Sequence, residues 1–317
     1  MNWSRYNYLF KSSKYGYLLY NSLSNGFSEL DEETYNYLKT LENKENINIE
    51  DIKLKESLIE MKVLVENDKD EFYNIKYLNH LNRFYDDYME LTLNPTLHCN
   101  FDCSYCFEES KPAKYMTDEV ENSLIGFIEK NKKIKQFHIT WFGGEPLMAF
   151  DRIVSITNRI KEIGINFKAH MITNAYLLTD KVIDMLDDLN INKIQITVDG
   201  LAEIHDKRRP LVSGGKTFDK IVSNIDNLKR KKEDFPIVIR VNVDKNNEND
   251  FIEVLKFFYK RYNGKIFIAP GFVTGENRCT ASDCLMDRNR KNEFFVNLYK
   301  QYGVNIMGFY PTLQSLH

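Results

Sequence analysis

Residues 89–106 read MELTLNPTLHCNFDCSYC, a candidate strand at 89–94 followed by a loop that holds three cysteines. Cys99, Cys103 and Cys106 form a C-x3-C-x2-C group in that loop. In parallel α/β folds, the loops that follow the strands build the active site. The stretch therefore predicts a group of thiol side chains at the end of the first strand of an α/β region.

From residue 89 onward, candidate strands alternate with helical patterns. The expected strands are Met89–Asn94, Phe137–Phe142, Phe167–Ile172, Lys193–Val198, Pro236–Val243 and Lys265–Ala269. Apolar stripes at helical spacing lie between them: Val120/Leu124/Phe127/Ile128, Ile153/Ile156/Ile160/Ile163, Val182/Ile183/Leu186/Leu189, Phe218/Ile221/Ile225/Leu228 and Phe251/Val254/Leu255/Phe258. This alternation predicts right-handed βαβ units and a parallel sheet, although element order alone leaves an open sheet and a barrel equally possible.

Residues 1–85 differ from this regular region, because their elements are short and do not alternate. We expect a strand with an open edge at Tyr15–Tyr20, a helix capped by Asp31, a second helix over Ile52–Ile59, a strand at Met61–Val65 and a turn at Asn67–Asp70. This order suggests a small winged-helix-like module.

Composition limits the class of protein. With 43% apolar and 13% aromatic residues, the 317-residue chain can bury a large core, which excludes wholesale disorder. The 43 basic and 46 acidic residues give a net charge of −3, so nucleic acid is not an expected partner. The sequence shows neither a membrane-spanning run nor a signal peptide, and we expect a cytoplasmic protein. In the cytoplasm, five cysteines are better interpreted as metal ligands or reactive thiols than as structural disulfides.

Three thiolates within eight residues can surround one soft metal centre. An iron–sulfur cubane takes four ligands, so a three-cysteine loop leaves one iron open for catalysis. Two alternatives remain at this point. Zinc could bind the three cysteines and His98, although His98 directly precedes Cys99 and would chelate awkwardly. The cysteines could also be buried and inert.

The cysteine loop, with Tyr105 before its last cysteine, resembles the signature of the radical SAM superfamily. Phe142–Pro146, at the end of the second strand, resembles the GGEP motif of that family. Thr197–Gly200 stands where relatives commonly carry Ser-x-Asp-Gly, and His205–Arg209 resembles the H-D-x-x-R that follows. The resemblance covers about residues 89–270 and implies a partial (β/α)6 barrel of TIM type.

The resemblance also implies the chemistry. Cys99, Cys103 and Cys106 would hold three irons of a 4Fe–4S cluster, and S-adenosylmethionine would chelate the fourth iron. A one-electron donor such as a flavodoxin or ferredoxin would reduce the cluster. Cleavage of S-adenosylmethionine would then give a 5′-deoxyadenosyl radical that takes a hydrogen atom from the substrate. The sequence assigns no catalytic residue beyond this machinery.

The same resemblance suggests which residues contact S-adenosylmethionine. We expect Gly143, Gly144 and Glu145 at the methionine amino end, Thr197 with Arg209 or Arg240 at the carboxylate, Asn174 and Asp199 at the ribose or the reacting groups, and Tyr105 beside the cluster or the adenine. Arg240 and Asn242 alternate with apolar residues and therefore share one face of the fifth strand. Local ion pairing is the alternative for Arg209 and Arg240.

Within the superfamily, the chain resembles peptide maturases and anaerobic sulfatase maturases with a C-terminal SPASM or twitch region. We expect a peptide-recognition module at 1–85, a radical SAM core at 86–275 and the start of an incomplete extension at 276–317. Cys279 and Cys284 could contribute to an auxiliary cluster but cannot hold a cubane alone. The expected substrate is a precursor peptide, modified for example by thioether formation. Sulfatase maturation and a non-catalytic iron–sulfur or peptide-binding role are the alternatives.

Overall fold

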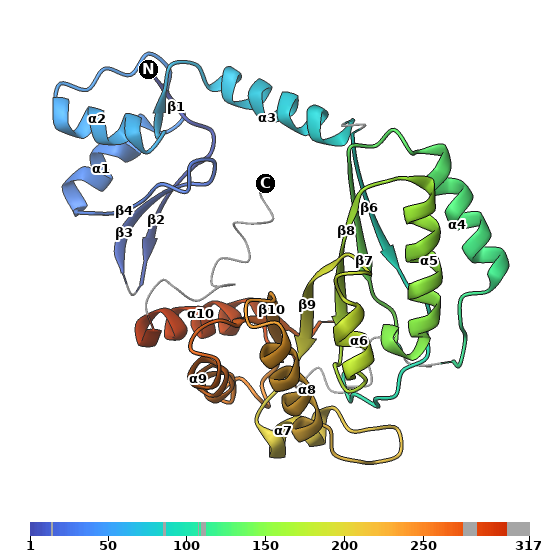
Figure 1. Ribbon diagram of the computed structural model, residues 1–317. Coiled ribbons are helices and arrows are strands. Elements are labelled where there is room, and N and C mark those ends of the chain that lie inside the picture. The colour runs from blue at the N-terminus through green and yellow to red at the C-terminus, as the bar shows by residue number, and fades with distance from the viewer. Residues whose placement is uncertain (14, 85–86, 107, 109–111, 275–283, 303–317) are drawn as a thin grey trace. The chain divides into compact units, whose positions relative to one another are not determined.

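The computed structural model describes residues 1–317 except 14, 85–86, 107, 109–111, 275–283 and 303–317 (Figure 1). The chain divides into two compact units, Met1–Tyr85 and Asp86–His317. Within the described residues, none of the helices is both long and apolar enough to cross a membrane.

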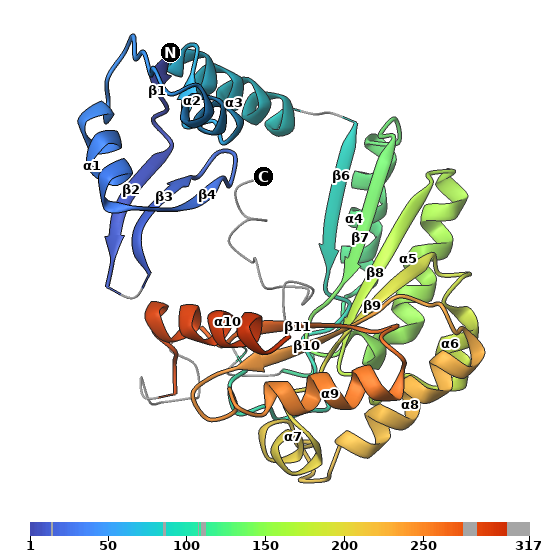
Figure 2. The same cartoon turned by 90° about the vertical axis from the view of Figure 1, so that its left-hand side faces the viewer.

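The larger unit is built on a six-stranded sheet in the order β11-β10-β9-β8-β7-β6. The strands are β6 (Tyr88–Leu93), β7 (Gln136–Trp141), β8 (Phe167–Thr173), β9 (Ile191–Thr197), β10 (Ile237–Val243) and β11 (Phe267–Phe272). Every neighbouring pair is parallel. Because each right-handed crossover steps in the same direction, the helices gather on one face and the sheet curls (Figure 2). Over the described residues β6 and β11 pair on one side only, and the predicted partial barrel is confirmed.

Helices follow the strands and cover the outer face of the sheet. They are α4 (Asp118–Lys130), the short 3-10 helix η1 (Pro146–Ala149), α5 (Phe150–Ile163), α6 (Asp180–Met185), α7 (Ala202–Arg208), α8 (Phe218–Lys231), α9 (Phe251–Arg261) and α10 (Arg288–Tyr302). The stripes expected on α5 and α8 are buried at Ile153, Ile156, Ile160, Ile221, Ile225 and Leu228. They pack in one cluster with the outward residues of the strands, such as Phe137 and Met171.

The stripe predicted for α4 is partly wrong. Val120 and Phe127 are 52% and 49% exposed, whereas Ile125 and Glu121 point inward and are buried. Glu121 accepts hydrogen bonds from Ser155 and Arg159 on α5 at 2.7 and 2.9 Å, and it also pairs with Arg152. Burial opposes its ionisation, but these donors outweigh burial and lower the pKa of Glu121. The spacing of apolar residues does not predict an inward-facing glutamate. Glu121 can be buried because the arginine and serine side chains balance its charge.

The smaller unit has an antiparallel sheet of β2 (Asn7–Ser12), β3 (Gly16–Asn21) and β4 (Phe27–Leu30), with β3 in the centre. A second pair joins β1 (Asn2–Trp3) to β5 (Leu64–Val65), and the helices are α1 (Glu32–Leu41), α2 (Ile52–Glu60) and α3 (Asp68–Arg83). As expected, Asp31 caps α1, accepting from the Thr34 backbone N–H at 2.7 Å. Leu19 and Leu38 lie in the core of this unit and are completely buried.

Two expectations for the smaller unit are wrong. The turn expected at Asn67–Asp70 is the start of α3, where Asn67 is the N-cap and accepts from the Lys69 N–H at 3.0 Å. Asn and Asp favour turns and helix N-caps for the same reason, since their side chains bond nearby backbone N–H groups. The strand expected to offer an edge at Tyr15–Tyr20 is β3, which is paired on both sides. Within the described part of the chain, β2 and β4 each pair on one side only and are the edges of this sheet.

Candidate active site

A cavity of about 470 Å³ lies where the strands of the larger unit end. Its walls include every residue expected at the cluster or at the cofactor except Asp199: Cys99, Cys103, Tyr105, Cys106, Gly143, Gly144, Glu145, Asn174, Thr197, Arg209 and Arg240. These residues come from six different segments of the chain. The fold therefore brings together groups that the sequence separates by more than 100 residues.

The two glycines of the Gly-Gly-Glu-Pro segment hold the loop that leads into the cysteines. Gly143 has a φ of +115°, a conformation that L side chains rarely adopt. A Cβ on Gly144 would lie 2.5 Å from the Leu97 carbonyl oxygen. The Gly144 N–H donates to the Thr96 carbonyl at 3.1 Å. The close approach that requires glycine is thus between two backbone segments, and both glycines also line the cavity.

The other side of the cysteine loop pairs with the end of α7 and the residues just after it. The Asp102 N–H donates to the Pro210 carbonyl at 2.9 Å, and the Ser104 N–H donates to the Arg208 carbonyl at 3.1 Å. Phe101 is completely buried between these contacts. A loop fixed on both sides presents its thiols without a further ordering cost when a ligand binds.

The same loop contacts the end of β8. The Asn174 amide donates to the Asn100 side chain at 2.8 Å, and the Asn174 oxygen accepts from the Tyr176 N–H at 3.0 Å. Asn174 borders the cavity, but these contacts give it a structural task as well.

The thiols fit an iron–sulfur cluster better than a zinc ion. Cys99 and Cys103 are buried and Cys106 is half-buried, and all three face the cavity. Among the described residues, no three His, Cys, Asp or Glu side chains lie close enough together to hold a single metal ion. The His98 ring is engaged elsewhere, with its Nδ1 3.0 Å from the Tyr115 hydroxyl. Thiolates spread around a cavity suit a larger centre, in which each binds a different iron.

Glu145 is held by its own chain. It is 1% exposed and accepts from the Thr173 hydroxyl at 2.6 Å and from the Asn174 and Leu147 backbone N–H groups at 2.7 and 3.0 Å. Burial raises the pKa of Glu145 in spite of these donors. Both carboxylate oxygens are therefore in use, and Glu145 joins the end of β7 to the end of β8. A ligand ammonium at this place would share those oxygens.

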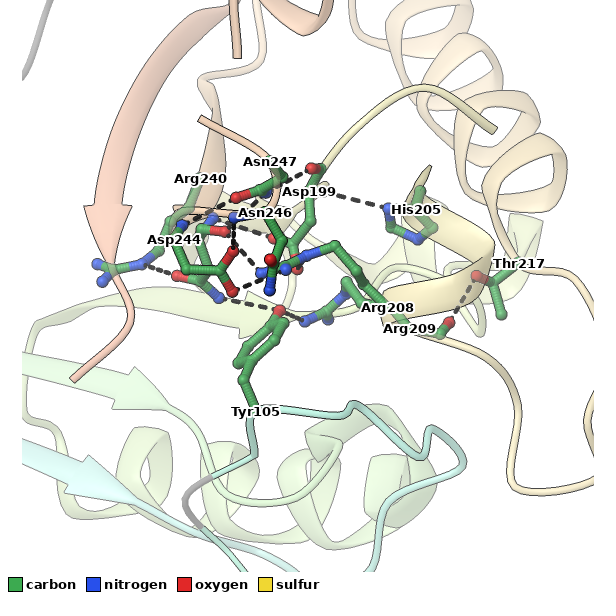
Figure 3. Close-up of polar contacts among 11 residues, drawn as sticks. Tyr105, Asp199, His205, Arg208, Arg209, Thr217, Arg240, Asp244, Asn246 and Asn247 are labelled. Atoms are coloured by element: carbon green, nitrogen blue, oxygen red, sulfur yellow. Dashed lines mark hydrogen bonds and ion pairs between the residues drawn. The ribbon is translucent and has the colours of Figure 1, made fainter. Parts of the chain in front are cut away.

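Tyr105 and Arg209 form a second polar wall of the cavity, and Figure 3 shows their side chains pointing toward one another. The Tyr105 hydroxyl accepts from Arg209 Nη1 at 2.5 Å and from Asn242 Nδ2 at 3.1 Å. The guanidinium of Arg208 lies 5.0 Å from the centre of the Tyr105 ring. Arg209 is 8% exposed, and its buried Nε lacks a hydrogen-bond partner within the described part of the chain. A buried cation with an unused donor is the group in this wall most ready to bind an anion.

Asp199 lies outside the cavity, in contrast to the expectation that it faces the ribose. It is completely buried, and Oδ1 accepts from the Asn242 backbone N–H at 3.0 Å. Its Oδ2 is 3.5 Å from Arg208 Nε, and its backbone carbonyl accepts from Asn247 at 2.8 Å. Asp199 therefore ties the end of β9 to the end of β10 and supports the wall from behind (Figure 3).

Arg240 lies flat against β11. Its Nε donates to the Asn242 side chain at 2.9 Å, and a Cβ on Gly271 would lie 2.6 Å from that Nε. Glycine at 271 thus makes room for the guanidinium. Gln195, which also lines the cavity, did not stand out in the sequence. The signal was present, because Gln195 precedes Thr197 by two residues on β9 and so shares its face.

The structure describes only one of the two cysteines proposed for an auxiliary cluster. Cys279 lies outside the described residues. Cys284 is buried, and its backbone carbonyl accepts from the Lys245 N–H at 2.9 Å. Cys284 is not among the residues that line the cavity.

The model of the radical SAM superfamily matches residues 93–258, just over half of the chain. The serine-type anaerobic sulfatase-maturating enzyme of Bacteroides thetaiotaomicron is 29% identical over 145 residues, 42% of this chain and 34% of that protein. The cysteine-type enzyme of Clostridium novyi is 28% identical over 174 residues, 52% of this chain and 46% of that protein. The chain thus spans about half the length, or less, of these curated relatives.

Two solved structures share the fold. The structure of anSMEcpe with bound AdoMet and Cp18Cys peptide has a TM-score of 0.57 at 22% identity, over 67% of this chain and 59% of that one. The structure of Streptococcus suis SuiB bound to precursor peptide SuiA has a TM-score of 0.51 at 17% identity, over 96% of this chain and 71% of that one. At these identities the similarity establishes the fold.

Proposed function

The chain belongs to the radical SAM superfamily, and from that premise we propose that it is an enzyme that uses a 4Fe–4S cluster and S-adenosylmethionine to modify a peptide. The observation that carries this proposal is the single cavity that Cys99, Cys103, Cys106 and Arg209 share. When bound, the cluster supplies one electron to S-adenosylmethionine, whose cleavage gives the radical that takes a hydrogen atom from the substrate.

The chain's own groups would place the cofactor. The three thiolates hold three irons and leave the fourth to S-adenosylmethionine. Arg209 has the unused donor to bind the carboxylate of the methionine, because a guanidinium matches a carboxylate in two hydrogen bonds. Tyr105 fixes the direction of that guanidinium. Thr197, on the same wall, offers a hydroxyl to the same carboxylate.

Part of the remaining wall of the cavity is apolar, although Glu108, Gln195 and Thr274 also line it. The apolar part consists of Phe142, Ile172, Phe272 and Val273. Such side chains exclude water and offer no acidic or thiol hydrogen close to a reactive radical. This wall supports radical chemistry on a substrate that enters the cavity.

The peptide substrate is the finer part of the proposal. The SuiB structure, which has a bound precursor peptide, resembles this chain over 96% of its length, a share that requires the smaller unit as well as the barrel. We assign to Met1–Tyr85 the recruitment of a precursor peptide, by addition of an extended strand to a free edge. Those edges are β2 and β4, not β3. The competing role for this unit is to cover apolar surface of the barrel.

Sulfatase maturation is the second candidate. The two sulfatase-maturating relatives match 42% and 52% of the chain. A sulfatase maturase has no need of a separate peptide-recruiting unit, and residues 1–85 therefore favour the first candidate. A flavodoxin or ferredoxin as electron donor, and an auxiliary cluster at Cys279 and Cys284, belong to the same proposal.

The test is anaerobic reconstitution with iron and sulfide, followed by measurement of bound iron and of 5′-deoxyadenosine formed after reduction. The wild type should bind a cluster and form 5′-deoxyadenosine, and the variant with Cys99, Cys103 and Cys106 all changed to Ala should do neither. Continued cleavage of S-adenosylmethionine by that variant would refute the proposal. Deleting residues 1–80 tests recruitment separately, because cleavage without peptide should persist while modification of a peptide encoded beside the gene should fall.

A further inference from the structure

Over strands β6 to β9, the inner, concave face of the sheet is mostly polar. On β7 and β8 the outward residues Phe137, Ile139, Ala169 and Met171 are buried against the helices. The residues between them point to the opposite face and are His138, Thr140, Lys168 and His170. Closed barrels of this type fill their interior with branched apolar side chains. A polar interior in this partial barrel therefore indicates a polar occupant.

Three of these residues, together with Glu90 on β6 and Lys193 on β9, form what we call the inner strip: Glu90, His138, Lys168, His170 and Lys193. The sheet register pairs Glu90 with His138, His138 with Lys168, and His170 with Lys193. Paired residues of a parallel ladder point to the same face, so the strip crosses four neighbouring strands, β6 to β9. The Tyr88 ring, 5.5 Å from the His138 ring, closes its outer end.

The inner strip continues directly from the cavity. Ile172 and Gln195 line the cavity, and His170 and Lys193 precede them by two residues on the same strands. Two residues of strand correspond to about 7 Å. A molecule whose reacting group lies beside the cysteine loop can therefore reach the strip with its next part.

The charges of the inner strip favour an anion. Neither the Lys168 nor the Lys193 ammonium has an ion-pair partner among the described residues. Glu90 accepts from the Tyr88 hydroxyl at 2.7 Å. Burial, then Lys193 and His138, lower the pKa of His170, and Glu90 only partly opposes this. His170 is therefore neutral at neutral pH and can donate one hydrogen bond. Two ammonium groups face one carboxylate that is already engaged.

We propose that the inner strip binds a carboxylate of the peptide substrate, from an Asp or Glu side chain near the residue that is modified. From Thr197, at the cofactor end of β9, to Lys193 is four residues or about 13 Å, which an extended peptide spans in three to four residues. The acidic residue would thus lie about three to four positions from the modified one. The peptide nature of the ligand rests on the proposed function, but the preference for an anion rests on the strip alone.

The experiment uses the full chain, reconstituted anaerobically, and two fluorescein-labelled synthetic peptides of equal length. One carries Glu at alternate positions and the other carries Gln there. The whole chain has a net charge of −3, so non-specific attraction disfavours the Glu peptide. We expect the Glu peptide to bind about fivefold more tightly, the scale of partly exposed ion pairs. Lys168→Gln/Lys193→Gln should abolish this preference, while iron content and cleavage of S-adenosylmethionine without peptide stay unchanged.

The matched control is Lys130→Gln/Lys260→Gln, which removes two exposed lysines from α4 and α9 and should keep the preference. Glu90→Gln gives an independent test of opposite sign, because removal of the only carboxylate of the strip should strengthen binding of the Glu peptide. Equal or undetectable binding of the two peptides to the wild type would overturn the inference, as would a preference that survives the Lys168/Lys193 change. A chain that prefers the Glu peptide but never cleaves S-adenosylmethionine would refute the proposed function and leave this inference standing.

Discussion

The two polar walls of the cavity differ in how their hydrogen bonds are used. At the end of β7, the Gly144 N–H and the Glu145 carboxylate form their hydrogen bonds within the chain. Gly144 bonds to the backbone before the cysteines, and Glu145 bonds to the end of β8. On the second wall, Arg209 keeps a buried Nε without a partner in the described structure. The first wall supports the cysteine loop, and we propose that the second binds the cofactor. Proximity to a cavity therefore does not by itself make a residue a ligand contact.

The largest effect is expected from Gly144→Val. A branched side chain would collide with the Leu97 carbonyl, where even a Cβ would lie at 2.5 Å, and would displace the loop before Cys99. Overpacking of this kind costs about 1–3 kcal/mol or more. We expect bound iron to fall to a small fraction of the wild-type content, measured after anaerobic reconstitution.

Gly126→Val is the control for that variant. Gly126 lies in α4 with open space around its Cβ position, so iron content should be preserved there. Wild-type iron content in Gly144→Val would show that the first wall does not hold the cysteine loop, and the comparison between the walls would fail.

The second effect, smaller and of a different kind, is expected from Arg209→Lys. Lysine keeps the positive charge but loses the forked donor and the bond to the Tyr105 hydroxyl. Affinity for S-adenosylmethionine should fall about tenfold to thirtyfold, the scale of one charge-assisted hydrogen bond. Iron content should remain near the wild-type value. Equilibrium binding of S-adenosylmethionine, measured beside iron content, checks both statements, and unchanged affinity would assign the carboxylate to another residue.

Tyr105→Phe should give the smallest effect. The ring and its contact with Arg208 remain, while the acceptor for Arg209 and Asn242 is lost. A single hydrogen bond contributes about 1 kcal/mol, so affinity for S-adenosylmethionine should fall about fivefold. The KM for S-adenosylmethionine should rise with little change in kcat. A loss of iron instead would mean that Tyr105 supports the loop rather than the arginine.

Much of the fold and the cavity could be predicted, because the decisive residues are contiguous. The cysteine spacing, the Gly-Gly-Glu-Pro segment and the alternation of strands and helices each lie within short windows of sequence. Strand alternation also placed Arg240 and Asn242 on one face, and both line the cavity.

The errors concern what a residue touches across the fold. Sequence patterns show which face a residue occupies but not which backbone lies opposite, so the contact of Gly144 with Leu97 was not foreseen. Asp199 follows a strand that ends at the cavity, yet it turns to Asn242 and Arg208 behind the wall. Glu121 points inward because two arginines from another helix compensate its charge. Each of these depends on partners that are distant in sequence.

The most direct test of the account is the electron paramagnetic resonance spectrum of the reduced, reconstituted protein, recorded with and without S-adenosylmethionine. We expect one iron of the cluster to lack a protein ligand and to lie beside Arg209, within the loop of Cys99, Cys103 and Cys106. This arrangement predicts that S-adenosylmethionine changes the cluster spectrum of the wild type, and that Arg209→Lys needs a higher concentration for the same change. A cluster spectrum that S-adenosylmethionine leaves unaltered at every concentration would contradict the account.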